Sequence, residues 1–245
     1  MKILCLGDSL TVGMVTMWQQ PAPYSDMLRQ MLVDSLLFPD QKIEIQNVAE
    51  NGAVAAGVLH VQLSLSDVKN LQWVIVLVGT NDIGMLGTYG IVEALEGVRS
   101  IIAALLMESP AANIALVSVP PMGVAGYKSQ QVRVCYNRQL ASLVQEHRQC
   151  HEARSRSQLH YVDWYSQVAE VVETHCSTSG ATSGGVEEED GVVLPQLHDE
   201  GMKELVQLQQ QYNGDGLHLS AKGYEVLAQM LFQVICKDEK LLPQD

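Results

Sequence analysis

Short apolar runs alternate along the chain with longer segments in which apolar residues recur every three or four positions. The runs at 2–6, 73–78 and 114–119 are almost continuously apolar, and the second is β-branched at four positions. Such runs are typical of strands buried on both faces of a parallel sheet. Residues 43–48 alternate apolar and polar side chains and predict a strand covered on one face. A last short strand is predicted at 159–162.

The segments between these runs have the periodicity of helices. Residues 24–37 place Met27, Leu28, Met31 and Leu32 at helical spacing, with prolines on either side. Further helices are predicted over 54–65, 91–107, 131–148 and 220–234. Strand and helix therefore alternate from end to end. This order predicts an α/β fold with about five parallel strands and helices on both faces of the sheet.

One stretch near the carboxyl end interrupts the alternation. Residues 174–185 are rich in Ser, Thr and Gly and lead into the acidic run 187–190, after which 199–212 has the spacing of an amphipathic helix. We expect a single domain over 1–245 with a variable loop and helix excursion at 174–214. The excursion is either a loop and helix packed on the body or a cap beside an active site.

Composition and charge narrow the function classes. The chain has 245 residues, 47% hydrophobic, and a net charge of −13. A nucleic-acid partner is disfavoured because the mean charge repels a polyanion. No apolar run is long enough to cross a bilayer, so no integral membrane association is expected. The five cysteines are scattered singly and no signal-peptide pattern is seen, which favours free thiols and a cytoplasmic location. The oligomeric state is not indicated.

Small and polar residues follow each of the first three predicted strands. These positions matter because ligands of open parallel sheets bind beyond the carboxyl ends of the strands. The first strand is followed by Gly-Asp-Ser-Leu-Thr-Val-Gly at 7–13, the second by Asn-Gly at 51–52 and the third by Gly-Thr-Asn-Asp at 79–82. We therefore expect a site where these three loops meet.

Ser9 has several readings when taken alone. A serine after a strand commonly caps the next helix through its hydroxyl oxygen. A helix start can also hold an anion, although the glycine and lysine order of a phosphate-binding loop is absent. The third reading is a nucleophile, which needs a base to remove its proton.

His218 is the strongest candidate for that base among seven histidines. The other six lie mostly in polar stretches, whereas His218 lies in a loop just before the last predicted helix. Asp215, three residues earlier, could hydrogen-bond the second ring nitrogen and fix its tautomer. Asp215 could equally be a turn former between Gly214 and Gly216, and Ser220 could cap the final helix.

Acyl transfer also needs donors for the developing oxyanion. Asn81 offers a side-chain N–H, and Gly52 and Ser9 offer backbone N–H groups. Each has an ordinary alternative: Asn81 with Asp82 is a common turn pair, and Gly52 is a residue suited to a positive φ.

These four segments together resemble the SGNH hydrolase superfamily of GDSL-type esterases and lipases. Its blocks are matched by Gly7-Asp8-Ser9-Leu10, by Asn51-Gly52, by Gly79-Thr80-Asn81-Asp82 and by Asp215-Gly216-Leu217-His218, in family order. The resemblance implies a three-layer α/β/α sandwich, flavodoxin-like, with a five-stranded parallel sheet.

The resemblance also implies roles for single residues. Ser9 would be the nucleophile, His218 its base and Asp215 the partner of the base, with Ser9, Gly52 and Asn81 as oxyanion donors. The expected reaction is hydrolysis of carboxylic esters or thioesters through an acyl-enzyme on Ser9, with small or medium acyl chains. The expected partner is a small-molecule ester, and no metal or organic cofactor is implied.

Two other function classes remain open from the residues. One is a metal-dependent phosphoesterase that uses Asp8, Asp82, Asp215 and His218. The other is a non-catalytic ligand-binding protein on the same fold. The apolar residues Met14, Met17, Trp18 and Tyr24 could line an acyl pocket or belong to the core.

Overall fold

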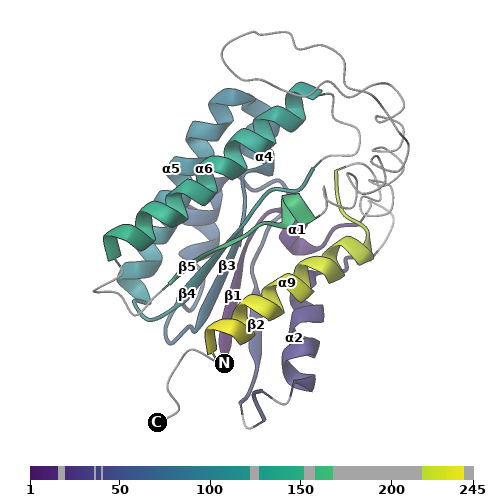
Figure 1. Ribbon diagram of the computed structural model, residues 1–245, viewed down its shortest axis with the longest axis vertical. Helices are drawn as coiled ribbons and strands as arrows, with labels where there is room; N and C mark the ends of the chain where they lie inside the picture. The colour runs from purple at the N-terminus through teal and green to yellow at the C-terminus, as the bar shows by residue number, and fades with distance from the viewer. Residues whose placement is uncertain are drawn as a thin grey trace.

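A single parallel sheet forms the centre of the computed structural model, which describes residues 1–15, 20–35, 37–39, 41–121, 127–151, 158–167 and 217–239. Its strands lie in the order β2-β1-β3-β4-β5, and every neighbouring pair is parallel (Figure 1). They are β1 (Lys2–Gly7), β2 (Glu44–Asn47), β3 (Trp73–Leu77), β4 (Asn113–Val117) and β5 (Leu159–Val162). The five predicted strands are therefore confirmed, with small shifts at their ends.

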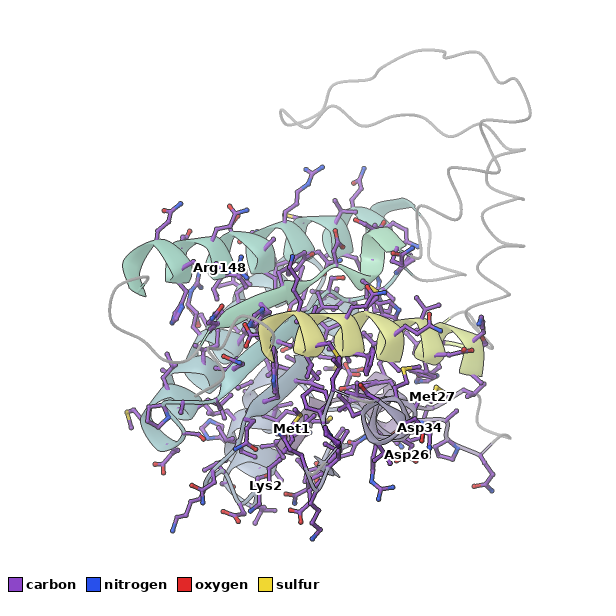
Figure 2. The ribbon with its side chains drawn as sticks, turned by 60° about the horizontal axis from the view of Figure 1, so that its bottom comes forward. Met1, Lys2, Asp26, Met27, Asp34 and Arg148 are labelled. Atoms are coloured by element: carbon purple, nitrogen blue, oxygen red, sulfur yellow. The ribbon has the colours of Figure 1, made fainter. Side chains whose placement is uncertain are left out.

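Helices cover both faces of this sheet. One face packs against α3 (Ala55–Gly57), η1 (Val58–Leu63), α4 (Thr80–Leu86), α5 (Thr88–Glu108) and α6 (Tyr127–His151). The other packs against α1 (Ser9–Val12), α2 (Tyr24–Asp34) and α9 (Ala221–Glu239). Figure 1 shows α5 and α6 on one side of the strands and α9 and α2 on the other, and Figure 2 shows α2 nearly end-on beside α9. The predicted α/β/α sandwich is confirmed.

The central strands are apolar on both faces because helices cover both. Successive side chains of a strand point to opposite faces, so each strand contributes to two cores. Leu4, Leu6, Val74 and Val76 join the core under α5 and α6. Ile3, Cys5, Ile75 and Leu77 join the core under α2 and α9.

The helices differ from the sequence expectation in two places. The segment expected as one helix over 54–65 forms a short α-helix followed by η1, a π-helix of six residues. The helix α4 was not expected, because Asn81, Asp82 and Gly84 are residues that favour turns. In the structure Asp82 lies in the first turn of α4, where a negative charge interacts favourably with the positive end of the helix dipole.

The excursion expected at 174–214, including the helix expected at 199–212, lies outside the described residues. Within the described part of the chain, no helix has the length and apolar character needed to span a membrane.

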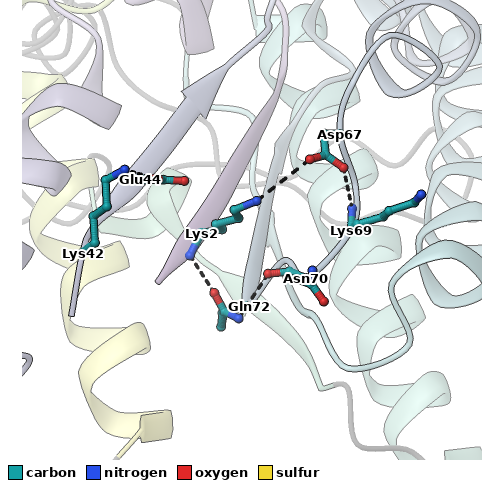
Figure 3. Close-up of polar contacts among 7 residues, drawn as sticks. All are labelled: Lys2, Lys42, Glu44, Asp67, Lys69, Asn70 and Gln72. Atoms are coloured by element: carbon teal, nitrogen blue, oxygen red, sulfur yellow. Dashed lines mark hydrogen bonds and ion pairs between the residues drawn. The ribbon is translucent and has the colours of Figure 1, made fainter.

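The amino ends of the strands are tied together by exposed polar contacts. The Lys2 N–H donates to Gln72 Oε1 at 2.6 Å, and Lys2 Nζ lies 3.9 Å from Asp67 (Figure 3). Exposed pairs of this kind add little stability. This end of the sheet is opposite to the loops that follow β1 and β3.

Candidate active site

The loops that follow β1 and β3 lie side by side, although more than 60 residues separate them in sequence. The chain runs from β1 outward to β2 and then returns to the other side of β1 to form β3, so the strand order reverses between β1 and β3. Ligands of flavodoxin-like sheets bind at such a reversal. Ser9 and Asn81 therefore reach the same edge of the sheet, as the sequence predicts.

Ser9 is the first residue of α1 and does not cap it. The cap is Asp8, whose Oδ1 accepts the Leu10 N–H at 2.9 Å. The capping reading of Ser9 is therefore wrong. The anion reading is also disfavoured, because the Asp8 carboxyl group already occupies an N–H of this four-residue helix. The Ser9 hydroxyl is left to interact with another element.

His218 is that partner. Its Nε2 lies 2.9 Å from Ser9 Oγ, across 209 residues of sequence. Ser9 is buried, with 7% of its surface exposed, and His218 is half-buried, so the pair is largely shielded from solvent. The two side chains are within the hydrogen-bond distance expected of a nucleophile and its base.

The chain around His218 is anchored to the loop after α1. Ser220 precedes α9, and its Oγ accepts the Gly223 N–H at 3.4 Å, so the predicted cap role of Ser220 is confirmed. In the first turn of α9, the Tyr224 hydroxyl donates to the Met14 carbonyl at 2.6 Å. The first turn of α9 is thereby held beside the segment that follows α1. Asp215 lies outside the described residues.

The loop after β3 holds the loop that contains Gly52. Asn81 Nδ2 donates to the Ala53 carbonyl at 2.9 Å, and both Asp82 carboxyl oxygens lie 3.2 Å from the Ala55 nitrogen. Gly52 has a φ of 76°, the left-handed conformation that glycine adopts without strain. Asn81 and Asp82 thus belong to the first turn of α4 and hydrogen-bond to the neighbouring loop, so they do not form an isolated turn.

The end of β3 is fixed from α6. The Tyr136 hydroxyl donates to the Val78 carbonyl at 2.8 Å, and Gly79 has a φ of 113°. A Cβ on Gly79 would lie 2.7 Å from the Tyr136 ring, so a glycine is needed where the chain turns toward Asn81.

Beneath the loops lies a group of buried ionisable side chains. Burial raises the pKa of Asp8 from 3.8 to about 7, the Leu10 N–H lowers it in part, and the charge of Asp82 raises it further. Burial also lowers the pKa of Arg133 to about 10, and the charge of Asp8 offsets part of this shift. The Arg133 guanidinium donates to the Pro120 carbonyl at 3.3 Å. Asp8 precedes Ser9 directly in the chain, so the residue beside the serine is influenced by both a buried cation and a second carboxyl group.

Sequence reasoning missed the supporting residues Gln62, Arg133, Tyr136 and Tyr224. Each lies inside a helix, at a position where a polar or amphipathic side chain is usually solvated. The one available signal was local: Arg133 and Tyr136 are three residues apart in α6, so one helix face combines them.

Two further expectations concern the surroundings of Ser9. Tyr24 is fully buried in the core under α2 and α9, so it does not line a pocket. Met14 is half-buried, and Met17 and Trp18 lie outside the described residues. Among the described side chains, no three His, Cys, Asp or Glu residues are grouped as metal ligands would be, and Asp215 falls outside that set.

The strand order and the meeting of these loops define a flavodoxin-like α/β/α protein with a serine and histidine paired at the switch point. Residues 5–226 match the model of the GDSL-like lipase/acylhydrolase family, and the chain belongs to this family. It is accordingly a hydrolase of the esterase and lipase type. No curated protein sequence gives a significant match.

Solved structures of similar fold cover nearly the whole chain. An acetylxylan esterase from Geobacillus stearothermophilus has a TM-score of 0.63 at 16% identity, over 96% of this chain and 93% of its own. A carbohydrate esterase family 3 protein from Talaromyces cellulolyticus has a TM-score of 0.60 at 14% identity, over 99% of each chain. A lipase/acylhydrolase from Enterococcus faecalis has a TM-score of 0.56 at 17% identity, over 100% and 98%. At these identities the likeness establishes the fold.

Proposed function

We propose that this protein is a serine esterase that hydrolyses carboxylic esters or thioesters through an acyl-enzyme on Ser9. The observation that supports this most directly is the distance of 2.9 Å between Ser9 Oγ and His218 Nε2. A serine hydroxyl becomes a useful nucleophile only when a base is within reach of its proton.

In the first half-reaction Ser9 Oγ attacks the ester carbonyl carbon while its proton passes to His218 Nε2. A tetrahedral intermediate forms, with the negative charge on the former carbonyl oxygen. The carbon–oxygen bond to the leaving alcohol then breaks, and His218 returns the proton to that oxygen. In the second half-reaction water attacks the acyl carbon while His218 takes one of its protons. The bond between that carbon and Ser9 Oγ then breaks, His218 returns the proton to Oγ, and the acid product leaves.

The proposed oxyanion donors are the backbone N–H groups of Ser9 and Gly52 and the side chain of Asn81. The Asn81 amide has two N–H bonds, and one of them is directed at Ala53. Holding the Gly52 loop and stabilising the oxyanion are therefore compatible roles for one side chain. Donors fixed before the reaction need no reorganisation when the charge develops.

The proposed orienting acid is Asp215. It would accept the Nδ1–H of His218 and stabilise the imidazolium that forms in each half-reaction. With Ser9 and His218 it completes a triad in the chain order serine, aspartate, histidine.

The proposed substrates are small-molecule esters with small or medium acyl chains. Support comes from the structurally similar proteins described as an acetylxylan esterase and a carbohydrate esterase, which share this fold. A series of p-nitrophenyl esters of increasing acyl length tests this part of the proposal.

The deciding experiment combines turnover with covalent labelling. Ser9→Ala and His218→Ala should each lower p-nitrophenyl acetate turnover by about 10⁴-fold or more, because the two side chains act as one unit. A fluorophosphonate should label the folded wild-type protein and leave Ser9→Ala unlabelled. Ser25→Ala is the control, since Ser25 is a buried serine that accepts a hydrogen bond from Asn47.

Other outcomes would favour the other function classes. Wild-type turnover by Ser9→Ala, together with loss of activity in EDTA, would contradict the triad and favour a metal-dependent phosphoesterase. A folded protein that neither turns over esters nor reacts with the fluorophosphonate would favour a binding protein.

A further inference from the structure

Gln62, in η1, is a buried polar side chain to which the proposed mechanism assigns no role. It is 2% exposed, whereas Val61 beside it is 40% exposed. Its Oε1 accepts the Gly7 N–H at 2.9 Å, and its Nε2 donates to the Gly7 carbonyl at 2.7 Å. The amide orientation follows from the backbone, because an N–H needs an acceptor and a carbonyl needs a donor.

At the end of β1, Gln62 supplies the acceptor that the Gly7 N–H lacks from β2, and it adds a second donor to the Gly7 carbonyl. The chain after β2 still donates to β1, through Val48 N–H to Cys5 and Glu50 N–H to Gly7. The ladder itself ends at the Cys5–Asn47 pair, and the Gly7 N–H bonds to Gln62. A buried N–H without a partner is costly, so the side chain completes the sheet at this point.

Gly7 is the last residue of β1, and the direction of the chain from Gly7 determines how it enters α1. Its φ is 157°, and a Cβ there would collide with the Leu77 carbonyl and the Thr11 hydroxyl. The plane of the Gly7–Asp8 peptide sets the direction of the next two residues. Fixing both polar groups of Gly7 therefore fixes where the Ser9 hydroxyl and the Ser9 N–H point.

The winding of η1 brings Gln62 to this position. A π-helix holds more residues per turn than an α-helix, which changes the side chain that faces the sheet, and such turns are frequent at functional sites. The element packs against β1 and α5.

We propose that Gln62 is a positioning residue for the nucleophile: it acts through Gly7 to hold Ser9 in line with His218 and with the oxyanion donors. This inference rests on the proposed role of Ser9. Its specific consequence is that loss of the Gln62 pair lowers kcat and the rate of Ser9 phosphonylation while KM changes little.

Asn137, in α6, offers a matched control. Its side chain makes the same two-bond pair with Val119, accepting from the Val119 N–H and donating to the Val119 carbonyl, both at 2.9 Å. Asn137 is 5% exposed, so it is buried like Gln62. Its partner Val119 lies just after β4, and no proposed catalytic residue lies in the segment between β4 and α6. A purely structural role would make the two pairs equivalent.

The experiment compares Gln62→Met with Asn137→Leu, two substitutions of similar volume that remove one pair each. We expect Gln62→Met to lose about 10- to 100-fold in kcat and in fluorophosphonate labelling rate, as for a small displacement of a reacting group, with KM within about threefold. Asn137→Leu should have a lower melting temperature than wild type, and its kcat should stay near the wild-type value. Equal losses of kcat in two folded variants would overturn the proposal, as would wild-type kcat in Gln62→Met.

Gln62→Glu provides a rescue that does not depend on the tolerance of the apolar variant. A protonated glutamic acid has one O–H donor and one carbonyl acceptor, and it can repeat both bonds to Gly7. Its carboxylate cannot donate, and burial should raise its pKa into the assay range. The ratio of Gln62→Glu kcat to wild-type kcat should be near one at about pH 5.5 and fall as pH rises.

A Gln62→Glu enzyme that is no more active than Gln62→Met at the low-pH end would contradict the positioning role. Failure of the proposed function gives a different result. In that case the wild-type protein itself would not be labelled at Ser9, and its turnover would not depend on Ser9.

Discussion

Burial, more than any neighbouring group, determines the charge of the carboxyl group beside Ser9. Asp8 is fully buried, and its pKa rises from 3.8 to about 7 mainly for that reason. Its Oδ2 accepts no hydrogen bond from the described residues. A carboxylate of this kind is easier to protonate in the folded protein than in the unfolded chain, which links it to stability.

The sign of that link can be tested with Asp8→Asn. Because the folded pKa is the higher one, the contribution of Asp8 to stability is complete below about pH 3.8 and is lost as pH rises through about 7. Asparagine keeps the cap acceptor for Leu10 and has no charge. The difference in free energy of unfolding, Asp8→Asn minus wild type, should therefore increase by about 2–4 kcal/mol as the pH is raised from acidic to alkaline.

Thermal or urea unfolding from pH 5 to pH 9 measures this difference. Asp67→Asn is the control, since Asp67 is an exposed aspartate and its replacement leaves the buried Asp8 carboxyl group in place. A stability gap between Asp8→Asn and wild type that is constant across the range would contradict the assignment.

The residues proposed for catalysis could be selected from the sequence, whereas the residues that hold them in place could not. Ser9, Gly52, Asn81 and His218 stand at strand or helix ends, where local sequence shows both the turn and the chemistry. Gln62 contacts Gly7 across 55 residues, and no local pattern marks that contact. Its polarity suggests a solvated position until the fold brings it against β1.

At the scale of elements, the α/β alternation was predictable because two periodicities separate strands from helices. What sequence did not predict were features decided by neighbours: α4, formed from turn-favouring residues, and the π-winding of η1. His160 is a similar case. It lies within the predicted strand 159–162, and the fold brings its ring 4.9 Å from that of Trp73, a contact that no local pattern indicates.

The element that brings His218 to the site, α9, is fixed at both ends. Near its start Tyr224 bonds to Met14, and near its end Asp238 Oδ2 accepts from Asn113 Nδ2 at 2.6 Å. Asp238 Oδ1 also lies 3.8 Å from His160 Nε2. Burial lowers the pKa of His160, with Asp238 offsetting part of the shift, so the ion pair is weak at neutral pH. The bond to Asn113 is the main tie.

Removing that tie should cost stability without affecting the chemistry. Asp238→Ala leaves the part-buried Asn113 amide without its acceptor, which should lower the free energy of unfolding by about 1–3 kcal/mol. Asp238→Asn retains an acceptor oxygen and should lose less. Below the unfolding transition, both should keep wild-type kcat, because Asp238 lies near the opposite end of α9 from His218. Loss of kcat in folded Asp238→Ala would contradict this separation of roles.

At the scale of the whole molecule, the charge is a property that sequence provides directly. The chain has a net charge of −13 with 15 Lys and Arg residues, so its mean field repels anions approaching the site. This repulsion is screened by salt, since the Debye length falls from about 30 Å at 0.01 M to about 10 Å at 0.1 M. Substrate charge should therefore affect turnover in a salt-dependent way.

Two substrates with the same leaving group isolate this effect: the neutral 4-nitrophenyl butyrate and the anionic mono-4-nitrophenyl glutarate. Raising the salt from about 0.01 M to about 0.1 M should raise kcat/KM for the anionic ester several-fold and change that for the neutral ester by less than about twofold. Changing Glu187, Glu188 and Glu189 to Gln reduces the net negative charge from −13 to −10 and should weaken the salt response of the anionic ester. A kcat/KM for the anionic ester that falls with salt would mean that the site is locally positive, and the substrate class would then have to be sought among anionic esters.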